Sequence, residues 1–387
     1  MTNFHAEVVV IGAGPSGSHA AFGFAKRGLR VLLLEEHGEV GTPVHCTGVV
    51  GKECLERFPD IQACVWQSLE KIKILSRDGD SFFLPGMKAF VLNRRKLDLF
   101  LASKAEKEGA TLCLNHKVVS IEPKEDGLQI NGVCHGEQFS FSSKLAILTT
   151  GSKSRLAGRC GLGEPPQFLR GAQVEAEIES LSDVEVYLDE EVSPGSFAWA
   201  VPTSKGKAKL GLITLGNASI LLNKLFQSNF LKSRIKSILG KPVVSRIPLG
   251  PSPSSVFHRI LAVGDAAGQV KTTTGGGIYY GMLGAEVVVS TALKEYKKND
   301  FSPFALEAYH AAWKKMLGIE LKAGLYFRNL FRNVSNAQID QLIQLFKRED
   351  LQALVGHYAD FDRHSRLIFA LAKVPTLRSF ILKLLKG

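Results

Sequence analysis

The strongest constraint on the fold of this chain is a short stretch near its start. Residues 8–17 read Val-Val-Val-Ile-Gly-Ala-Gly-Pro-Ser-Gly, so a β-branched run leads directly into the spacing G-x-G-x-x-G. An alanine-rich segment follows and ends at Gly28, and a second apolar run, 31–34, ends at Glu35 and Glu36. This order predicts a strand, a tight turn, a helix and a second strand.

Each small residue of this stretch has a physical role if the turn binds a pyrophosphate. Gly12 permits the turn, Gly14 lets the backbone approach the phosphates, and Gly17 lets the helix pack on the strand. Free N–H groups near Ser16 and the helix dipole attract the anion. An acid at the end of the second strand, for which we choose Glu35, accepts hydrogen bonds from a ribose. A glycine-rich turn without a ligand explains neither the spacing nor the acid, so we expect dinucleotide binding.

Length and charge limit the other possibilities. A chain of 387 residues can bury a large core and form two or three domains. Its formal net charge of +11 favours anionic partners such as phosphorylated substrates, acidic lipid surfaces or nucleic acid. The sequence contains no uncharged apolar run of 18 residues, and it enters a strand almost at once. We therefore expect neither a transmembrane helix nor a signal peptide.

The cysteines do not form a recognisable metal or redox motif. No pair has the C-x-x-C spacing, so we expect no zinc site, no other metal and no thioredoxin-like pair. Free thiols in a reducing, cytoplasmic compartment are the simplest interpretation. The cysteines are Cys46, Cys54, Cys64, Cys113, Cys134 and Cys160.

The pattern after the first unit alternates between helix and strand. Residues 38–51 form a glycine-rich loop with few large apolar side chains, which suits a loop that runs past a ligand. Residues 71–84 read as a hairpin across Asp78-Gly79, and 92–109 as an amphipathic helix with Asn93 as its cap and Gly109 just beyond its end. Strands are expected near 111–114, 118–122, 128–133 and 138–141. An apolar strand, 145–148, ends at Thr149-Thr150-Gly151 and resembles a buried parallel strand with a ligand at its carboxyl end.

The period changes to two from about Gln173. Strands over 174–178, 184–188, 196–201 and 207–215 predict an antiparallel sheet with one wet face. Residues 219–239 read as a basic amphipathic helix. A buried strand returns at 259–263 and runs into Gly264-Asp265, and a glycine triplet, 275–277, opens a long apolar helix to about Leu293. Everything after Phe301 reads as helical.

The strands of the first domain are therefore interrupted in sequence by a second sheet. We expect a discontinuous nucleotide-binding domain over 1–165 and 255–300. The inserted substrate-binding domain covers 166–254 together with the hairpin 70–90. Residues 301–387 form a helical C-terminal domain.

Three motifs in this order resemble the FAD-dependent enzymes that include p-hydroxybenzoate hydroxylase and glutathione reductase: the glycine fingerprint, the strand end at 149–151 and the strand end at Gly264-Asp265. The resemblance implies an α/β fold with a Rossmann-type FAD-binding domain, an inserted antiparallel substrate sheet and a helical C-terminal segment. It also implies FAD contacts. Asp265 matches the ribitol-binding aspartate, Arg94 an FAD-contacting arginine and Val118 a backbone contact to the adenine end. The residues that match contacts to the pyrimidine end of the flavin ring are Gly276, Gly277 and Ile278.

Within that group the chain is most similar to the geranylgeranyl reductase family. The loop Pro43-Val44-His45-Cys46-Thr47-Gly48 resembles the family's loop along the flavin, which implies cofactor contacts for Cys46, Thr47 and Gly48 and a catalytic role for Cys46. Residues 197–202 and 208–211 resemble the lipid-site motif Y-x-W-x-F-P…A-N-V-G, which implies substrate contacts for Phe197, Trp199 and Pro202. The chain departs from this motif at Phe197, Val201 and Lys209-Leu210.

The family resemblance implies a reductase that uses FAD to saturate isolated double bonds of geranylgeranyl or other prenyl chains on isoprenoid lipids.

 The expected partners are thus a prenyl lipid and a membrane surface, with no nucleic acid. No second glycine fingerprint is present for NAD(P)H, so the electron donor is either transiently bound NAD(P)H or reduced ferredoxin. Two alternatives stay open: a flavin-dependent monooxygenase or halogenase of the same fold, and a non-catalytic prenyl-binding escort.

The end of the chain carries a basic amphipathic pattern. Between residues 373 and 387 there are four basic residues and no acid, and apolar residues recur at helical spacing. Such a helix suits a peripheral site on a membrane surface, and equally a terminal helix docked on the protein. The basic residues are Lys373, Arg378, Lys383 and Lys386.

Overall fold

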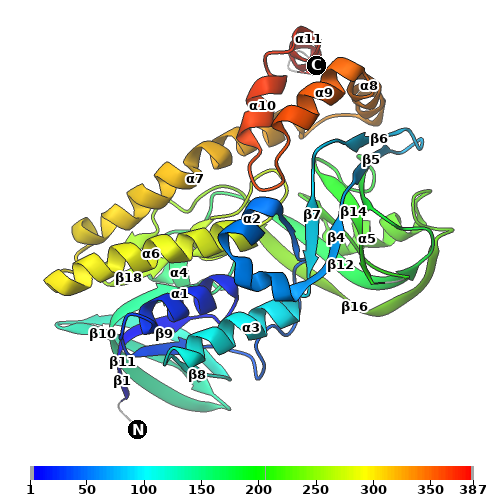
Figure 1. Ribbon diagram of the computed structural model, residues 1–387. Helices are drawn as coiled ribbons and strands as arrows, with labels where there is room; N and C mark the ends of the chain where they lie inside the picture. Colours follow the sequence, from blue (N-terminus) through cyan, green and yellow to red (C-terminus); the bar gives the residue numbers. More distant parts are fainter. Residues whose placement is uncertain (1–3, 205, 385–387) are drawn as a thin grey trace.

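The computed structural model of the chain describes residues 4–204 and 206–384, with side chains up to residue 382. Three sheets and a set of helices build a mixed α/β fold, as the sequence predicts (Figure 1). Six free cysteines are distributed over helices, strands and loops of the chain. In the described part of the chain, no helix is both long enough and apolar enough to cross a membrane.

The first sheet contains the parallel core expected from the glycine fingerprint. Its strands follow the order β17-β18-β11-β1-β2-β8, and β1 pairs in parallel with both β2 and β11. The antiparallel pair β9–β10 extends the first half of β11. The strands are β1 (Phe4–Ile11), β2 (Val31–Leu34), β8 (Thr111–Cys113), β9 (His116–Lys124), β10 (Gly127–Cys134), β11 (Glu137–Leu148), β17 (Val256–Phe257) and β18 (Ile260–Ala262).

One strand prediction in this sheet was wrong. The segments 138–141 and 145–148 are not separate strands but the two halves of β11. The first half pairs with β10 and the second half with β18, while β1 pairs along most of the strand. Because hydrogen-bond partners change along the strand without a break in pairing, the polar residues 142–144 between the halves stay extended.

Alternate residues of β1 face two different cores. Val8 and Val10 pack in a cluster that includes buried residues of the helices α1 (Pro15–Ala25), α3 (Arg94–Lys107) and α6 (Ile278–Lys298). Val9 and Ile11 pack with residues of β10 and of the short helix α4 (Leu156–Arg159) on the other face. This two-sided burial explains why the strand is a continuous apolar run rather than an alternating one.

The predicted boundaries of α3 are confirmed at both ends. The Asn93 side chain accepts a hydrogen bond from the Lys96 amide at 3.0 Å, so it caps the first turn. Gly109, two residues beyond the end of the helix, has φ +101°, a conformation that favours glycine.

The second sheet has seven strands in the order β16-β12-β15-β14-β13-β5-β6. The hairpin predicted over 71–84 is confirmed and joins this sheet, because β5 pairs in parallel with β13. A small sheet, β3-β7-β4, links it to the first. The strands are β3 (Val49–Gly51), β4 (Val65–Leu69), β5 (Ile72–Ser76), β6 (Ser81–Leu84), β7 (Ala89–Leu92), β12 (Phe168–Ile178), β13 (Val184–Leu188), β14 (Phe197–Ser204), β15 (Lys207–Thr214) and β16 (Ile235–Pro248). Between β3 and β4 lie the helices α2 (Lys52–Arg57) and η1 (Pro59–Cys64).

The helix predicted over 219–239 was wrong in its second half. Helix α5 (Ala218–Gln227) has Ser228 as its C-cap, and the side chains of Phe230 and Leu231 are buried in the core of the second sheet. From Ile235 to Gly240 burial alternates with a period of two, and β16 pairs with β12. The backbone groups at the edge of β12 need a partner strand. Pairing with β16 satisfies them, and this tertiary interaction outweighs the local helical pattern.

The C-terminal residues are helical, as predicted, and the long helix α7 (Pro303–Phe331) packs along α6 (Figure 1). Helices α8 and α9 contact the β5–β6 hairpin. In α11, Leu377 and Phe380 are buried against α8, so the described part of this helix is docked on the protein. The remaining helices are α8 (Asn336–Phe346), α9 (Glu349–Tyr358), α10 (Ser365–Leu371) and α11 (Pro375–Leu384).

Candidate functional site

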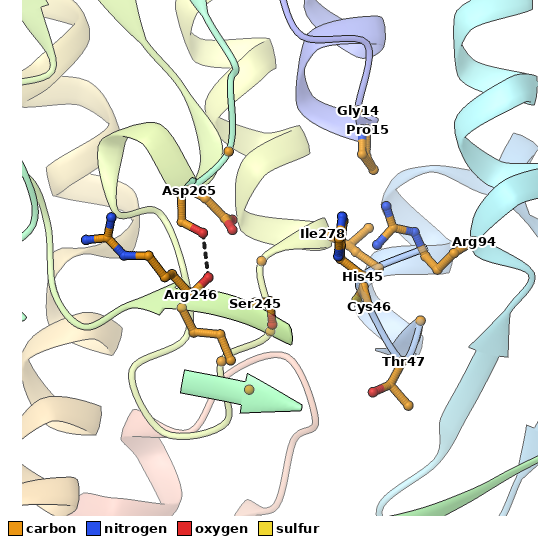
Figure 2. A pocket seen from close by; sticks show the side chains of 18 of the residues that line it. Gly14, Pro15, His45, Cys46, Thr47, Arg94, Ser245, Arg246, Asp265 and Ile278 are labelled. Atoms are coloured by element: carbon orange, nitrogen blue, oxygen red, sulfur yellow. Dashed lines mark hydrogen bonds between the residues drawn. The ribbon is translucent and has the colours of Figure 1, made fainter. Parts of the chain in front are cut away.

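A cavity of about 1140 Å³ lies where the first sheet, the second sheet and the C-terminal helices meet. Figure 2 looks into it, with Arg94 and the loop of His45, Cys46 and Thr47 on one side and Asp265, Ser245 and Arg246 on the other. All residues predicted to bind cofactor or substrate line this cavity except Gly17 and Pro202. The residues that do so are Gly12, Gly14, Ser16, Glu35, Cys46, Thr47, Gly48, Arg94, Val118, Phe197, Trp199, Asp265, Gly276, Gly277 and Ile278.

The three fingerprint glycines are required for three different reasons. Gly12 has φ +105°, and a Cβ there would lie 2.5 Å from the carbonyl oxygen of Thr149. A Cβ at Gly17 would lie 1.9 Å from the carbonyl oxygen of Gly12. Gly17 therefore allows α1 to pack closely against the turn, although it does not line the cavity. A Cβ at Gly14 would meet no protein atom within 4 Å. The space beside Gly14 is therefore open to a ligand that approaches the start of α1.

Glu35 lies at the end of β2, where an acid was expected. Its Oε2 accepts a hydrogen bond from the Ala13 amide at 2.9 Å, and its Oε1 pairs with His37 Nδ1 at 2.6 Å. The carboxylate is thus held against the glycine turn, close to the space beside Gly14. Val118, on β9, lines the same end of the cavity. This end of the cavity offers open space beside the start of α1 and a carboxylate acceptor, both of which an adenosine diphosphate group requires.

Asp265 has a carboxylate without a protein partner. It lies in the turn η2 (Gly264–Ala267) after β18, and no donor in residues 4–204 or 206–384 hydrogen-bonds to its side chain. Burial raises the pKa of this carboxyl to about 6, although Arg94 opposes the shift. A Cβ at Gly277 would lie 2.7 Å from Asp265 Oδ1, so glycine keeps the acid accessible. A ligand with hydroxyl groups would satisfy this carboxylate.

Three buried polar atoms at the cavity wall also lack partners in the described chain. They are Arg94 Nε, Thr150 Oγ1 and Trp199 Nε1. The other end of the Arg94 guanidinium is held, because its NH2 group donates to Asp98 Oδ1 and Oδ2 at 3.0 and 3.1 Å. Buried donors normally find acceptors, so a polar ligand is the natural partner for these atoms. The residues present therefore fit a dinucleotide such as FAD.

The loop that carries Cys46 borders the middle of the cavity. Its Gly48 has φ +88°, and a Cβ there would lie 2.6 Å from the carbonyl oxygen of Leu92, so the loop passes very close to β7. Burial and the nearby Lys153 lower the pKa of His45 to about 4. His45 is consequently neutral at neutral pH, and it adds no charge beside Cys46.

Two aromatic rings of β14 form one wall. Phe197 and Trp199 lie on the same face, as period two predicts, with ring centroids 6.0 Å apart. Val201 continues this face into the cavity. Pro202 does not line the cavity, and the prediction that it contacts substrate is not supported by its position. Side chains alternate between the two faces of a strand, so Pro202 lies on the face opposite to Phe197, Trp199 and Val201.

Beyond this wall the cavity extends into an apolar arm. Its sides come from the β5–β6 hairpin, from β13 and from the C-terminal helices, which the sequence patterns did not connect with the site. The residues of the apolar arm are Ile72, Ile74, Leu84, Met87, Val184, Val186, Phe327, Phe361, Leu367, Ile368 and Leu371.

Comparison with known proteins agrees with this geometry. Residues 7–380 match the sequence profile described as lycopene cyclase protein, which covers nearly the whole chain. The chain belongs to the lycopene cyclase protein family.

Relatives of this family member include the digeranylgeranylglycerophospholipid reductase of Methanocaldococcus jannaschii, 29% identical over 363 residues that cover 87% of this chain and 90% of the relative. The digeranylgeranylglycerophospholipid reductase 1 of Methanothermobacter thermautotrophicus is 28% identical over 88% of this chain and 90% of that protein. These similarities confirm the resemblance to the geranylgeranyl reductase family.

A solved structure shares the whole fold. The geranylgeranyl bacteriochlorophyll reductase-like protein of Thermoplasma acidophilum superposes with a TM-score of 0.85 and 20% identity, covering 98% of this chain and 99% of that one. The agreement confirms the predicted fold class, in which a Rossmann-type domain carries an inserted sheet and C-terminal helices.

Sequence reasoning missed several polar residues at this family member's site. Lys209 and Gln173 reach the Cys46 loop from the second sheet, and Lys271 lines the cavity next to Gly276. His364 reaches the cavity from the C-terminal helices. The available signal for Lys209 was a charged residue inside an apolar strand, which is uncommon unless the charge has a partner.

Proposed function

We propose that this chain is an FAD-dependent reductase that saturates isolated double bonds of geranylgeranyl or related prenyl chains on isoprenoid lipids. One observation carries the proposal: a single cavity joins a polar cradle for a dinucleotide to a long apolar arm. The names of the relatives support the same chemistry. An apolar arm of this kind suits a flexible hydrocarbon, because its binding depends on buried area rather than on directed hydrogen bonds.

We assign each part of FAD to residues that line the polar end of the cavity. Gly12, Gly14 and Ser16 at the start of α1 would receive the pyrophosphate, and Glu35 with Val118 the adenosine. Asp265 and Arg94 would hold the ribitol and the middle of the cofactor. The flavin ring would lie between two segments, Cys46, Thr47 and Gly48 on one and Gly276, Gly277 and Ile278 on the other. When bound and reduced, FAD supplies a hydride.

The protein's own contribution to alkene reduction is placement and one proton. An isolated alkene has no carbonyl that a side chain could polarise, so electrostatic assistance is small. Phe197 and Trp199 hold the hydrocarbon against the cofactor, and the apolar arm excludes water from the reacting carbons. We assign Cys46 as the catalytic residue, whose S–H lies at the cavity and can deliver the proton that completes the saturated bond.

The remaining assignments concern the electron donor, the cellular location and the domains. Electrons come from NAD(P)H or from a reduced ferredoxin. The apolar arm reaches α10, and α10 and α11 carry exposed apolar and basic side chains, so we assign the protein to the inner face of the cell membrane as a peripheral, cytoplasmic protein. For the domains we keep the boundaries predicted from the sequence: residues 1–165 and 255–300 for FAD binding, 166–254 with hairpin 70–90 for substrate binding, and 301–387 as the helical C-terminal domain.

A spectrum and an anaerobic turnover assay test the proposal. The purified protein should show flavin absorbance bands, and with reduced flavin it should convert a geranylgeranyl lipid to products heavier by two mass units for each bond saturated. Absence of flavin would favour the prenyl-binding escort instead. Consumption of oxygen coupled to NAD(P)H, with no saturated product, would favour a monooxygenase or halogenase.

A further inference from the structure

Lys209 is a buried cation that holds the Cys46 loop. The residue lies on β15 and is only 8% exposed. Its Nζ donates to the carbonyl oxygen of Cys46 at 3.0 Å and to that of Thr47 at 3.1 Å. One side chain of the second sheet thus binds two consecutive carbonyl groups of the loop that borders the cofactor cradle.

No carboxylate of the described chain forms a salt bridge with this ammonium group. Its other neighbour is the ring of Trp66, whose centroid lies 6.0 Å from Nζ. Burial lowers the pKa of Lys209 and the nearby Arg94 acts in the same direction, whereas Cys46 and Glu175, the residue paired with Lys209 on β12, oppose the shift. Removing an ammonium group from water is costly, and the two carbonyl hydrogen bonds offset part of the cost of burying this charge.

A second contact joins the same loop to the neighbouring strand. Thr47 Oγ1 donates to Gln173 Oε1 at 2.9 Å, and Gln173, on β12, is itself buried. In the sheet, Gln173 is paired with Gly211, and Gly211 is paired with Trp199. Lys209 is paired with Val201, which also lines the cavity. The two strands that hold the loop, β12 and β15, therefore lie in the same sheet as β14, which carries the aromatic wall and pairs with β15.

We propose that Lys209 is a positioning residue that locks the Cys46 loop onto the sheet carrying Trp199. Its two hydrogen bonds set the spacing between the cofactor side of the cavity and its aromatic wall. The consequence for turnover rests on the proposed function, whereas the lock itself does not.

Three variants of the full-length protein test this inference. Lys209→Met removes the charge and both hydrogen bonds while keeping most of the apolar length, and Lys209→Arg restores a cation with several donors. Lys207→Met is the matched control, because Lys207 lies on the same strand but is exposed. If Lys209→Met does not fold, Lys209→Gln provides a smaller change that also removes the charge and should show the same losses.

Hydrogen exchange gives a readout that is independent of catalysis. The Leu92 amide donates to the carbonyl oxygen of Gly48 at 2.8 Å, so its exchange rate reports on how firmly the loop is held. We expect exchange at Leu92 to be at least about fivefold faster in Lys209→Met, and close to the wild-type rate in Lys209→Arg and Lys207→Met. Unchanged exchange in Lys209→Met, or the same increase in Lys207→Met, would overturn the lock.

Turnover of a geranylgeranyl lipid with chemically reduced flavin provides the second readout. In Lys209→Met, kcat should fall at least about tenfold while KM stays within about threefold, because the loop positions reacting groups rather than binding the hydrocarbon. Lys209→Arg should recover most of kcat. A rise in KM with unchanged kcat would contradict a positioning role. Faster exchange in Lys209→Met, combined with a wild-type protein that reduces no alkene, would retain the lock and refute only the proposed function.

Discussion

The indole ring of Trp199 lies across Gly211 on the neighbouring strand. A Cβ at position 211 would be 2.5 Å from Cζ2 and 2.7 Å from Cε2 of Trp199, and 2.8 Å from the carbonyl oxygen of Ala172. No residue other than glycine can occupy this position unless both the indole and the backbone at Ala172 move. The orientation of the aromatic wall is therefore decided by the absence of a side chain on the strand beside it.

Gly211→Ala should push the indole of Trp199 away from β15 and into the cavity. We expect reduced turnover of prenyl lipids with a higher KM, and a loss of stability of about 1–3 kcal/mol from overpacking. Steady-state kinetics and urea unfolding measure the two effects. Gly318→Ala is the control, because a Cβ at this helical position meets nothing within 4 Å. Wild-type KM in Gly211→Ala would show that the indole does not bound the substrate.

Asp265 should make the cofactor-free protein less stable at neutral pH. Its pKa rises from 3.8 to about 6 on folding, so the folded state binds the proton more tightly than the unfolded state does. Stability contributed by the protonated acid is complete below pH 4 and is lost as the pH rises to about 6. The loss amounts to about 2–3 kcal/mol, since one pKa unit corresponds to about 1.4 kcal/mol.

Asp265→Asn tests both the stability of the cofactor-free protein and its affinity for FAD. At pH 7.5 the cofactor-free variant should unfold at a higher urea concentration than wild type, and the difference should disappear below pH 4. Its affinity for FAD should nevertheless fall by about 1.5–3 kcal/mol, through the loss of a charge-assisted hydrogen bond. Full retention of flavin, or equal stability at pH 7.5, would show that the carboxylate has another role.

Trp199→Ala should retain FAD and the fold but lose most alkene reduction. Without the indole the hydrocarbon is held less closely, and a displacement of about 1 Å can cost on the order of a hundredfold in rate. Saturated product is measured by mass spectrometry with chemically reduced flavin. Phe304→Ala serves as the control, because Phe304 is 90% exposed and lies outside the cavity.

Cys46→Ser should separate proton delivery from flavin reduction. Turnover of prenyl lipids should fall, because the thiol that we assign as the proton source is gone, whereas reduction of the bound flavin by dithionite should proceed at the wild-type rate. Both rates can be followed in one anaerobic stopped-flow experiment with product analysis. Wild-type turnover in this variant would exclude Cys46 as the catalytic residue.

The C-terminal helices should bind anionic membranes. Lys373 and Arg378 are exposed beside the exposed apolar side chains of Phe369 and Leu382, while Lys386 lies outside the described residues. Each basic residue near an anionic surface contributes about 1 kcal/mol, and salt screens this attraction. Flotation with anionic vesicles should weaken above about 0.5 M salt and in Arg378→Glu, but not in Lys297→Glu on α6. Equal binding to neutral vesicles would remove the electrostatic part of this prediction.

The sequence by itself determined those features that depend on neighbouring residues. The spacing of Gly12, Gly14 and Gly17 predicts the turn, because Gly12 has a φ of +105° and a Cβ at Gly17 would meet the carbonyl oxygen of Gly12 in the same strand-turn-helix unit. Asn93 caps α3 through the amide three residues later, and period two places Phe197 and Trp199 on one face. Such short-range sterics and hydrogen bonds are readable without knowledge of the rest of the fold.

Only the tertiary structure decided how distant segments share the cavity. Lys209 reaches a loop 163 positions earlier in the chain, and Phe361 and Leu367 complete an arm that begins at Ile72. The helical pattern after Gln227 gave way to β16 because the edge of β12 needed a partner. No local pattern encodes these contacts, since burial and strand pairing are gained only after remote segments have been brought together.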